Sequence, residues 1–168
     1  ARSGAIRQGG STLTQQLAKN LFFEQDRTFT RKAAEAVVAV VLEWRYHKDR
    51  ILQAYLNEIY LGQRGSVSIR GFAQAAAFYF GKDVRHLTLA ESATLAGLIR
   101  APGVYNPFLH RDRALERRAM VLGAMEEAGM ISAQEHAAAE KAPLKLKKES
   151  EQRSPSRAVS YLADYARQ

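Results

Sequence analysis

The stretch from Gly9 to Asn20, Gly-Gly-Ser-Thr-Leu-Thr-Gln-Gln-Leu-Ala-Lys-Asn, constrains the fold of this chain more than any other. Its two glycines lack a Cβ, so the backbone can turn sharply or let a ligand come close. Thr12 and Gln15 then have the capping-box spacing with which a helix begins. Apolar side chains recur at every fourth position of that helix, at Leu13, Leu17 and Leu21. This spacing predicts an apolar stripe on one side of an amphipathic helix.

The other side of the same helix is polar, since it carries Thr12, Gln16 and Lys19. Hydroxyl, amide and ammonium groups therefore lie beside a helix N-terminus, where an anion is held favourably. An ordinary capped helix with a solvated polar face has the same pattern. The residues by themselves leave both interpretations open.

Helical patterns continue through most of the chain and predict a fold of the all-α class. The predicted helices cover residues 12–21, 30–46, 48–61, 72–80, 88–99, 113–128 and 132–141. Their end signals are Thr30, Gly62, Gly81, the Thr88–Glu91 capping box, Gly129 and the Ser132–Glu135 capping box. Residues 63–69 are expected to form an irregular loop or a short hairpin, and no convincing strand is apparent. A last short amphipathic element is expected over 158–168.

Residues 30–46 carry signals for both a strand and a helix. The valines favour a strand, but the stretch is too long for a typical one. Arg31, Lys32 and Glu35 also sit at helical spacing. We therefore expect a helix, and its apolar composition predicts that the helix is buried.

Composition narrows the classes of function. The 168 residues carry a net charge of +8 at pH 7, which favours nucleic acid, phosphorylated substrates or an anionic membrane surface as partners. Cysteine is absent, so disulfides and thiolate chemistry are excluded. No run of about eighteen apolar residues occurs, so no membrane-spanning segment is expected. The four histidines lack metal-ligand spacing, so no zinc site is expected; they are His47, His86, His110 and His136.

A second candidate site combines Arg27, Arg31, Lys32 and Glu35, together with Lys19. Arg31 and Glu35 are one helical turn apart and share a face. Arginine forks and lysine point charges around one carboxylate would suit a pyrophosphate-bearing substrate. The alternative is an ordinary salt-bridged helix face, in which the pair contributes only about 0.3–0.5 kcal/mol. Tyr55, Asn57, Tyr60 and Gly62 form a further possible binding edge, although core tyrosines with hydroxyls at the rim are the commoner case.

Several of these motifs together resemble a known family. Residues Gln8 to Asn20, Arg31 to Glu35, and Lys48 to Asn57 followed by Gly62 are similar to the peptidoglycan glycosyltransferase domain, glycosyltransferase family 51. That domain occurs in class A penicillin-binding proteins and in monofunctional transglycosylases. The later matches are Arg70 to Phe72, Glu91 to Leu98 and Ala101 to Pro107. The resemblance assigns residues 1–146 to this domain and 147–168 to a linker towards a possible transpeptidase domain.

The resemblance implies a lysozyme-like, mostly helical single domain at the outer, periplasmic face of the bacterial cytoplasmic membrane. It implies polymerisation of lipid II into β-1,4-linked glycan strands, with release of undecaprenyl pyrophosphate. The implied partners are lipid II, the nascent glycan strand, the membrane surface and moenomycin-type inhibitors, and not nucleic acid. The one cofactor that it suggests is a divalent cation, Mg²⁺ or Mn²⁺, bound with the pyrophosphate.

The resemblance also implies roles for individual residues. Glu35 matches the second catalytic glutamate of the family, and Lys19 and Arg27 resemble its pyrophosphate ligands. The further lining of the substrate groove would be Thr12, Gln16, Asn20, Arg31 and Lys32. Because nearby positive charge favours a carboxylate, Glu35 should stay ionised and act electrostatically or as an orienting group.

One family motif is not found in this sequence. The family's general-base glutamate lies in an opening Glu-Asp-x-x-Phe-x-x-His-x-Gly motif, and none of the eight residues before Gly9 is acidic. The family's membrane anchor is not in this sequence either. We expect this chain alone to have little or no polymerase activity, although part of the pyrophosphate site is retained.

Two other functions compete with this interpretation. A basic helical nucleic-acid-binding domain fits the charge, but no recognition helix or aromatic stacking platform is apparent. A lysozyme-like enzyme that cleaves glycans would need a neutral glutamic acid in an apolar pocket. Glu35, among cations, has the opposite setting.

Overall fold

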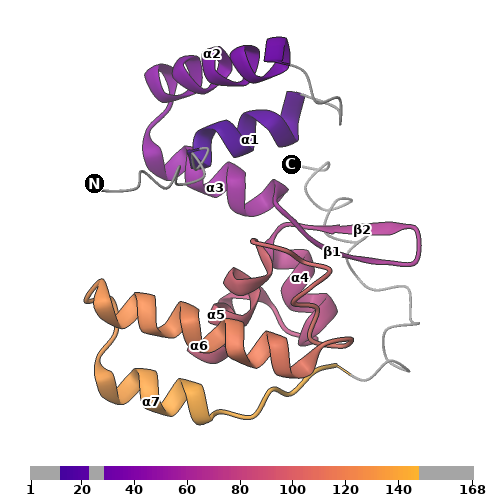
Figure 1. The fold of residues 1–168 in the computed structure, drawn as a ribbon, viewed down its shortest axis with the longest axis vertical. Coiled ribbons are helices and arrows are strands. Elements are labelled where there is room, and N and C mark those ends of the chain that lie inside the picture. Colours follow the sequence, from indigo (N-terminus) through magenta and orange to yellow (C-terminus); the bar gives the residue numbers. More distant parts are fainter. Residues whose placement is uncertain (1–11, 23–28, 148–168) are drawn as a thin grey trace, which may run out of the picture. The chain divides into compact units, whose positions relative to one another are not determined.

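The structure is a computed structural model that describes residues 12–22 and 29–147 (Figure 1). In chain order its elements are α1 (Leu13–Phe22), α2 (Phe29–Arg45), α3 (Lys48–Glu58), β1 (Tyr60–Arg64), β2 (Val67–Arg70), α4 (Phe72–Tyr79), the 3-10 helix η1 (Val84–His86), α5 (Leu89–Leu98), α6 (Arg111–Glu127) and α7 (Ala133–Lys141). The prediction of a mostly helical fold is confirmed. Of the two alternatives predicted for residues 63–69, the short hairpin is confirmed. Its two strands begin at Tyr60 and end at Arg70. The element predicted over 158–168 lies outside the described residues.

The chain divides into two compact units, residues 1–59 and 60–168, which we call the N-terminal and C-terminal units and describe separately. No helix in the described ranges is long and apolar enough to cross a membrane.

In the N-terminal unit, α1 packs against both α2 and α3. The predicted capping box is present at its start, because Gln15 N–H donates to Thr12 Oγ1 at 3.2 Å and Thr12 N–H donates to Gln15 Oε1 at 3.3 Å. The predicted leucine stripe is only partly right. The buried side chains of α1 are Thr14, Leu17 and Ala18, whereas Leu13 and Leu21 are exposed.

Helix α2 differs from its prediction in two ways. Thr30 does not cap it, because the helix already begins at Phe29. The helix is also not buried: its large exposed apolar side chains are Val37, Val40, Val41 and Trp44. Among the α2 side chains that the structure describes, Glu35 and Ala39 are buried. Helical periodicity identifies which residues share a face, but it does not tell which face the rest of the protein covers.

Helix α3 ends three residues earlier than predicted, at Glu58. Gly62 is not its C-cap but lies in β1, next to a register shift in the hairpin. Its φ of 143° is a conformation that favours glycine. A Cβ here would also collide with the hydroxyl of Tyr79, which donates to the backbone oxygen of Leu61 at 3.0 Å. Gly62 therefore serves the close approach of α4 to the hairpin.

In the C-terminal unit, α5 packs against α6, and α7 packs against both of these helices. Small side chains make this possible, since buried Ala90, Ala93 and Ala139 gather around Leu122. Both predicted capping boxes are present, at the starts of α5 and α7. Glu91 also accepts from Lys82 Nζ at 2.7 Å. The predicted stops at Gly81 and Gly129 are confirmed by their positive φ angles of 67° and 69°.

Replacement of Gly62 should be costly because it combines backbone strain with a steric collision. We expect Gly62→Ala to lower the free energy of unfolding by about 2–4 kcal/mol. The matched control is Gly65→Ala, which also has a positive φ, of 56°, but has no atom within 4 Å of the added Cβ. It should cost only about 1–2 kcal/mol. Urea denaturation followed by circular dichroism measures both, and equal losses would contradict the role given to Tyr79.

Candidate active site

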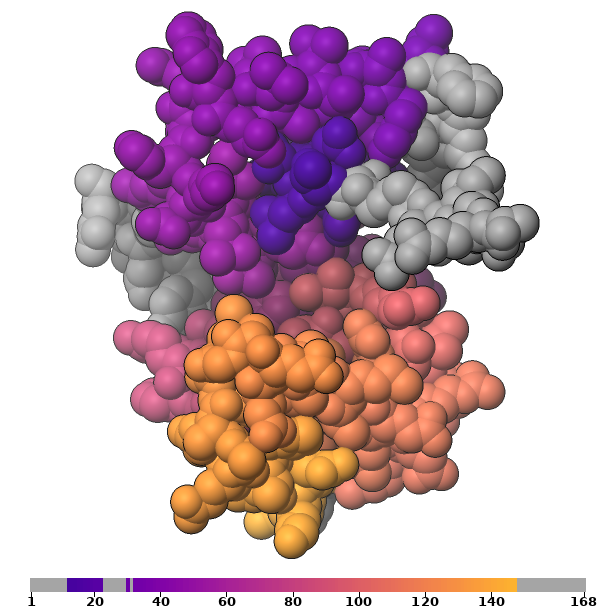
Figure 2. Space-filling view, turned by 60° about the vertical axis from the view of Figure 1, so that its left-hand side comes forward, coloured from indigo at the N-terminus to yellow at the C-terminus, as the bar shows by residue number. Residues whose placement is uncertain are grey.

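The predicted residues of the pyrophosphate site that the structure describes lie on α1, at its N-cap, or on α2, two helices that pack together in the N-terminal unit. In Figure 2 the indigo atoms of α1 form part of the surface of this unit, beside the purple atoms of α2. Thr12, Gln16 and Lys19 are three or four positions apart, so they follow one side of α1. The polar side predicted for this helix is therefore present.

Glu35 is the most deeply buried predicted site residue, with 1% of its surface exposed. Its Oε2 lies 3.1 Å from Nζ of Lys32, one helical turn earlier on α2. The side chain of Lys32 is 53% exposed, so this pair joins a buried carboxylate to an ammonium at the surface. A buried carboxylate needs such compensation, because an uncompensated charge in the interior is expensive. Glu35 therefore holds the Lys32 ammonium at a defined place.

Gln16 joins the polar side of α1 to α3. Its Oε1 accepts a hydrogen bond of 3.1 Å from the hydroxyl of Tyr55. Tyr55 is buried, and burial raises the pKa of its phenol above the usual value, so the hydroxyl remains a donor at neutral pH. The expectation that Tyr55 is a core tyrosine is confirmed. The sequence gives no signal for its partner, which is 39 residues away.

The remaining predicted residues are described to different extents. Lys19 is exposed in the last turn of α1. Asn20 is partly buried, and its Nδ2 has no hydrogen-bond partner in the part of the chain that the structure describes. Arg31 lies on α2, but its side chain is outside the description, and Arg27 lies outside the described residues altogether. The predicted convergence of these two arginines on Glu35 stays a prediction.

This arrangement can bind an anion but does not form a metal site by itself. Lys19 and Lys32 present ammonium groups at the surface of one unit, and lysine binds phosphate as a mobile point charge. Within residues 12–22 and 29–147, no group of three or more histidine, aspartate or glutamate side chains could hold a metal ion. The single carboxylate of Glu35, which already pairs with Lys32, does not provide the several oxygen ligands that such an ion needs.

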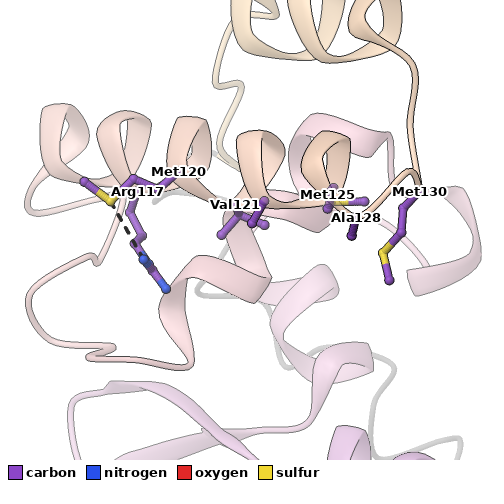
Figure 3. A pocket seen from close by; sticks show the side chains of 7 residues that line it. Arg117, Met120, Val121, Met125, Ala128 and Met130 are labelled. Atoms are coloured by element: carbon purple, nitrogen blue, oxygen red, sulfur yellow. Dashed lines mark hydrogen bonds between the residues drawn. The ribbon is translucent and has the colours of Figure 1, made fainter. Parts of the chain in front are cut away.

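A hollow in the C-terminal unit contains none of the predicted site residues. It has a volume of about 310 Å³ and lies along α6. Figure 3 shows side chains that line it along α6 and just past the end of that helix. The lining residues are Arg117, Met120, Val121, Ala124, Met125, Ala128 and Met130. Arg117 contributes the one polar side chain and lies 3.8 Å from the sulfur of Met120. Without a carboxylate or a second cation, this hollow is a poor candidate for glycosyl transfer.

Comparison with known proteins points to one family. The family model described as transglycosylase matches residues 1–126. Penicillin-binding protein 1B of Haemophilus influenzae is 50% identical over 147 residues, which are 88% of this chain and 19% of that protein. Penicillin-binding protein 1A of Aquifex aeolicus is 49% identical over 148 residues, which are 88% of this chain and 20% of that protein. The chain therefore spans about a fifth of the length of these relatives.

A solved structure agrees with this result. The crystal structure of penicillin-binding protein 1A from Haemophilus influenzae aligns with a TM-score of 0.56 and 30% sequence identity. The alignment covers 99% of this chain and 20% of that one. The mostly helical fold is thus shared with a protein of recognisable sequence similarity.

The Lys32–Glu35 pair predicts an unequal response to the loss of two surface lysines. Lys32→Met should lower the free energy of unfolding by about 1–2 kcal/mol, less than for a fully buried pair because Lys32 is half exposed. Lys19→Met is the matched control and should cost less than about 0.5 kcal/mol. Glu35→Gln added to Lys32→Met should recover part of the loss, because it removes the buried charge. Equal losses for the two lysines in thermal unfolding would show that Glu35 does not depend on Lys32.

Proposed function

Because the chain belongs to the transglycosylase family, we propose that it forms the pyrophosphate-binding part of a peptidoglycan glycosyltransferase. The proposed substrate is lipid II, which is polymerised into β-1,4-linked glycan strands with release of undecaprenyl pyrophosphate. The observation that carries this proposal is the buried Glu35 carboxylate with Lys32 Nζ at 3.1 Å, on the helix that packs against the polar α1. The pair lies within the Arg-Lys-x-x-Glu motif of the family.

In the proposed reaction these residues act mainly by electrostatic stabilisation and not by forming covalent bonds. When the bond from the sugar to the pyrophosphate breaks, negative charge grows on the leaving oxygens, and preplaced cations lower the barrier. Lys19 and Lys32 supply such cations, with Arg27 and Arg31 as further candidates. Glu35 keeps Lys32 in place through their ion pair. This role differs from that of the neutral acid that a glycan-cleaving enzyme would need.

The proton of the acceptor hydroxyl needs a general base, which typically contributes about 10²–10⁴-fold. We assign this role to the glutamate of the opening family motif, which is not among the residues of this sequence. A divalent cation, Mg²⁺ or Mn²⁺, would be held by the pyrophosphate oxygens rather than by a protein ligand set.

A lipid-linked substrate places the site at a membrane surface. The exposed valines of α2, together with Trp44, form a stripe at helical spacing, and Trp44 is 87% exposed. Contiguous exposed apolar side chains mark interaction surfaces, and tryptophan favours the boundary between lipid and water. We place this stripe against the outer face of the cytoplasmic membrane, with the net charge of +8 attracting anionic headgroups.

The reaction itself can be tested with lipid II. The 168-residue chain should give little or no polymer, whereas the same chain extended upstream through the opening motif should give glycan strands. Glu35→Gln in the extended chain should reduce turnover by about 10²–10³-fold. A moenomycin-type inhibitor should block the residual activity. The matched control is Glu127→Gln, an exposed glutamate of α6, which should leave turnover unchanged. Full activity of the Glu35→Gln variant would contradict the role assigned to Glu35.

Membrane contact can be followed through the single tryptophan of the chain. Trp44 fluorescence should shift to shorter wavelength when phosphatidylglycerol vesicles are added, and Val40→Asp should weaken this binding because it places a charge in the stripe. The matched control, Val67→Asp, changes a similarly exposed valine of the hairpin and should bind as the unaltered chain does. No shift with the unaltered chain, or equal loss for both variants, would contradict the placement of the stripe.

A further inference from the structure

One hydrogen bond ties two sequence motifs that are far apart in the chain. Tyr55 on α3 donates to Gln16 on α1, with 3.1 Å between Oη and Oε1. Both residues belong to the N-terminal unit, in which α1 and α3 pack together. Tyr55 is 4% exposed, whereas Gln16 is only partly buried. The bond therefore runs from the core of the unit to the polar side of α1.

The two partners differ in conformational freedom, because the tyrosine ring is fixed and the glutamine side chain is flexible. The hydrogen bond therefore lets the tyrosine position the glutamine. The phenol ring is held by its burial between helices, so its hydroxyl has a fixed position. A glutamine side chain has three rotatable bonds and loses substantial rotamer freedom when it is fixed. Once Oε1 accepts from the hydroxyl, the amide plane is set. The two Nε2 hydrogens, which are the donors of the side chain, then have a defined direction.

We propose that Tyr55 is a positioning residue that orients the Gln16 amide for the pyrophosphate–sugar part of the substrate. This role rests on the proposed function, since Gln16 lies on the same side of α1 as Lys19 and next to the motif that would bind the leaving group. The tyrosine itself is too deeply buried to be a ligand. It acts by giving a neutral donor beside the cations a fixed direction before the substrate binds, which lowers the ordering cost of binding.

Binding of a short-chain lipid II analogue to the whole chain tests this role by isothermal titration. Tyr55→Phe removes the hydroxyl and keeps the ring, and it should weaken binding about threefold to tenfold. Gln16→Ala should weaken binding by at least as much. Adding Tyr55→Phe to Gln16→Ala should have no further effect, because the tyrosine acts through the glutamine. Additive losses, or unchanged binding by Tyr55→Phe, would overturn the proposal.

The chain offers a control with the same chemistry in the other unit. Tyr79 is a fully buried tyrosine of the C-terminal unit, and its hydroxyl donates to the backbone of Leu61. Tyr79→Phe should lower stability as Tyr55→Phe does, but binding of the analogue by the folded protein should not change. If both variants weaken binding equally, general loss of stability explains the effect and the positioning role is wrong.

A second measurement separates this role from the function on which it rests. The side-chain amide signal of Gln16 in a ¹⁵N–¹H spectrum reports its environment without any ligand. It should shift and become more mobile in Tyr55→Phe and stay in place in Tyr79→Phe. If the unaltered chain does not bind the analogue, the proposed function fails, while this spectrum still decides whether Tyr55 orients Gln16. An unchanged Gln16 signal in Tyr55→Phe overturns the inference whatever the binding result.

Discussion

The burial of the Glu35 carboxylate is the constraint on which the N-terminal unit depends. A carboxylate with 1% of its surface exposed is tolerated only with opposite charge close by. Lys32 supplies that charge from the same helix at 3.1 Å, which ties the ammonium to a place that α2 defines. A site that stabilises a departing pyrophosphate needs its cations in position before the charge develops. Burial of the Glu35 carboxylate costs free energy, but it also requires the ion pair that preorganises the Lys32 ammonium.

The packing of α1 also preorganises the site, because it holds the polar side of this helix in place. Leu17 and Ala18 anchor the helix, and the Thr12–Gln15 capping box fixes its first turn. The polar side is then held by rigid backbone, and Gln16 is fixed further by Tyr55. Sites built on packed helices are more precise than sites on loops. Here three helices each contribute one element: the polar side from α1, the charged pair from α2 and the tyrosine from α3.

The parts of this arrangement that depend on local spacing were predictable from the sequence. The capping boxes at Thr12, Thr88 and Ser132 involve residues three apart, so the pattern contains both partners. Gly62 shows the limit, because a glycine after an apolar helix fits a C-cap as well as a strand position beside Tyr79. The Tyr55–Gln16 bond depends on tertiary packing between distant segments. Motif order predicts site residues through the resemblance to the family, but neither the burial of Glu35 nor the partner of Gln16 follows from it.

Helix α2 connects these observations, because it buries a carboxylate and exposes large apolar side chains. Glu35 is buried, whereas Val40 and Trp44 lie five and nine positions further on, about 140° and 180° around the helix, and are exposed. In water this is the reverse of the usual amphipathic helix. The reversal is reasonable if the outer side meets a medium less polar than water and the inner side holds charge for an anionic ligand. A substrate with a lipid tail and a pyrophosphate presents both environments at once. The same helix would then face the lipid with its valines and the leaving group with Lys32.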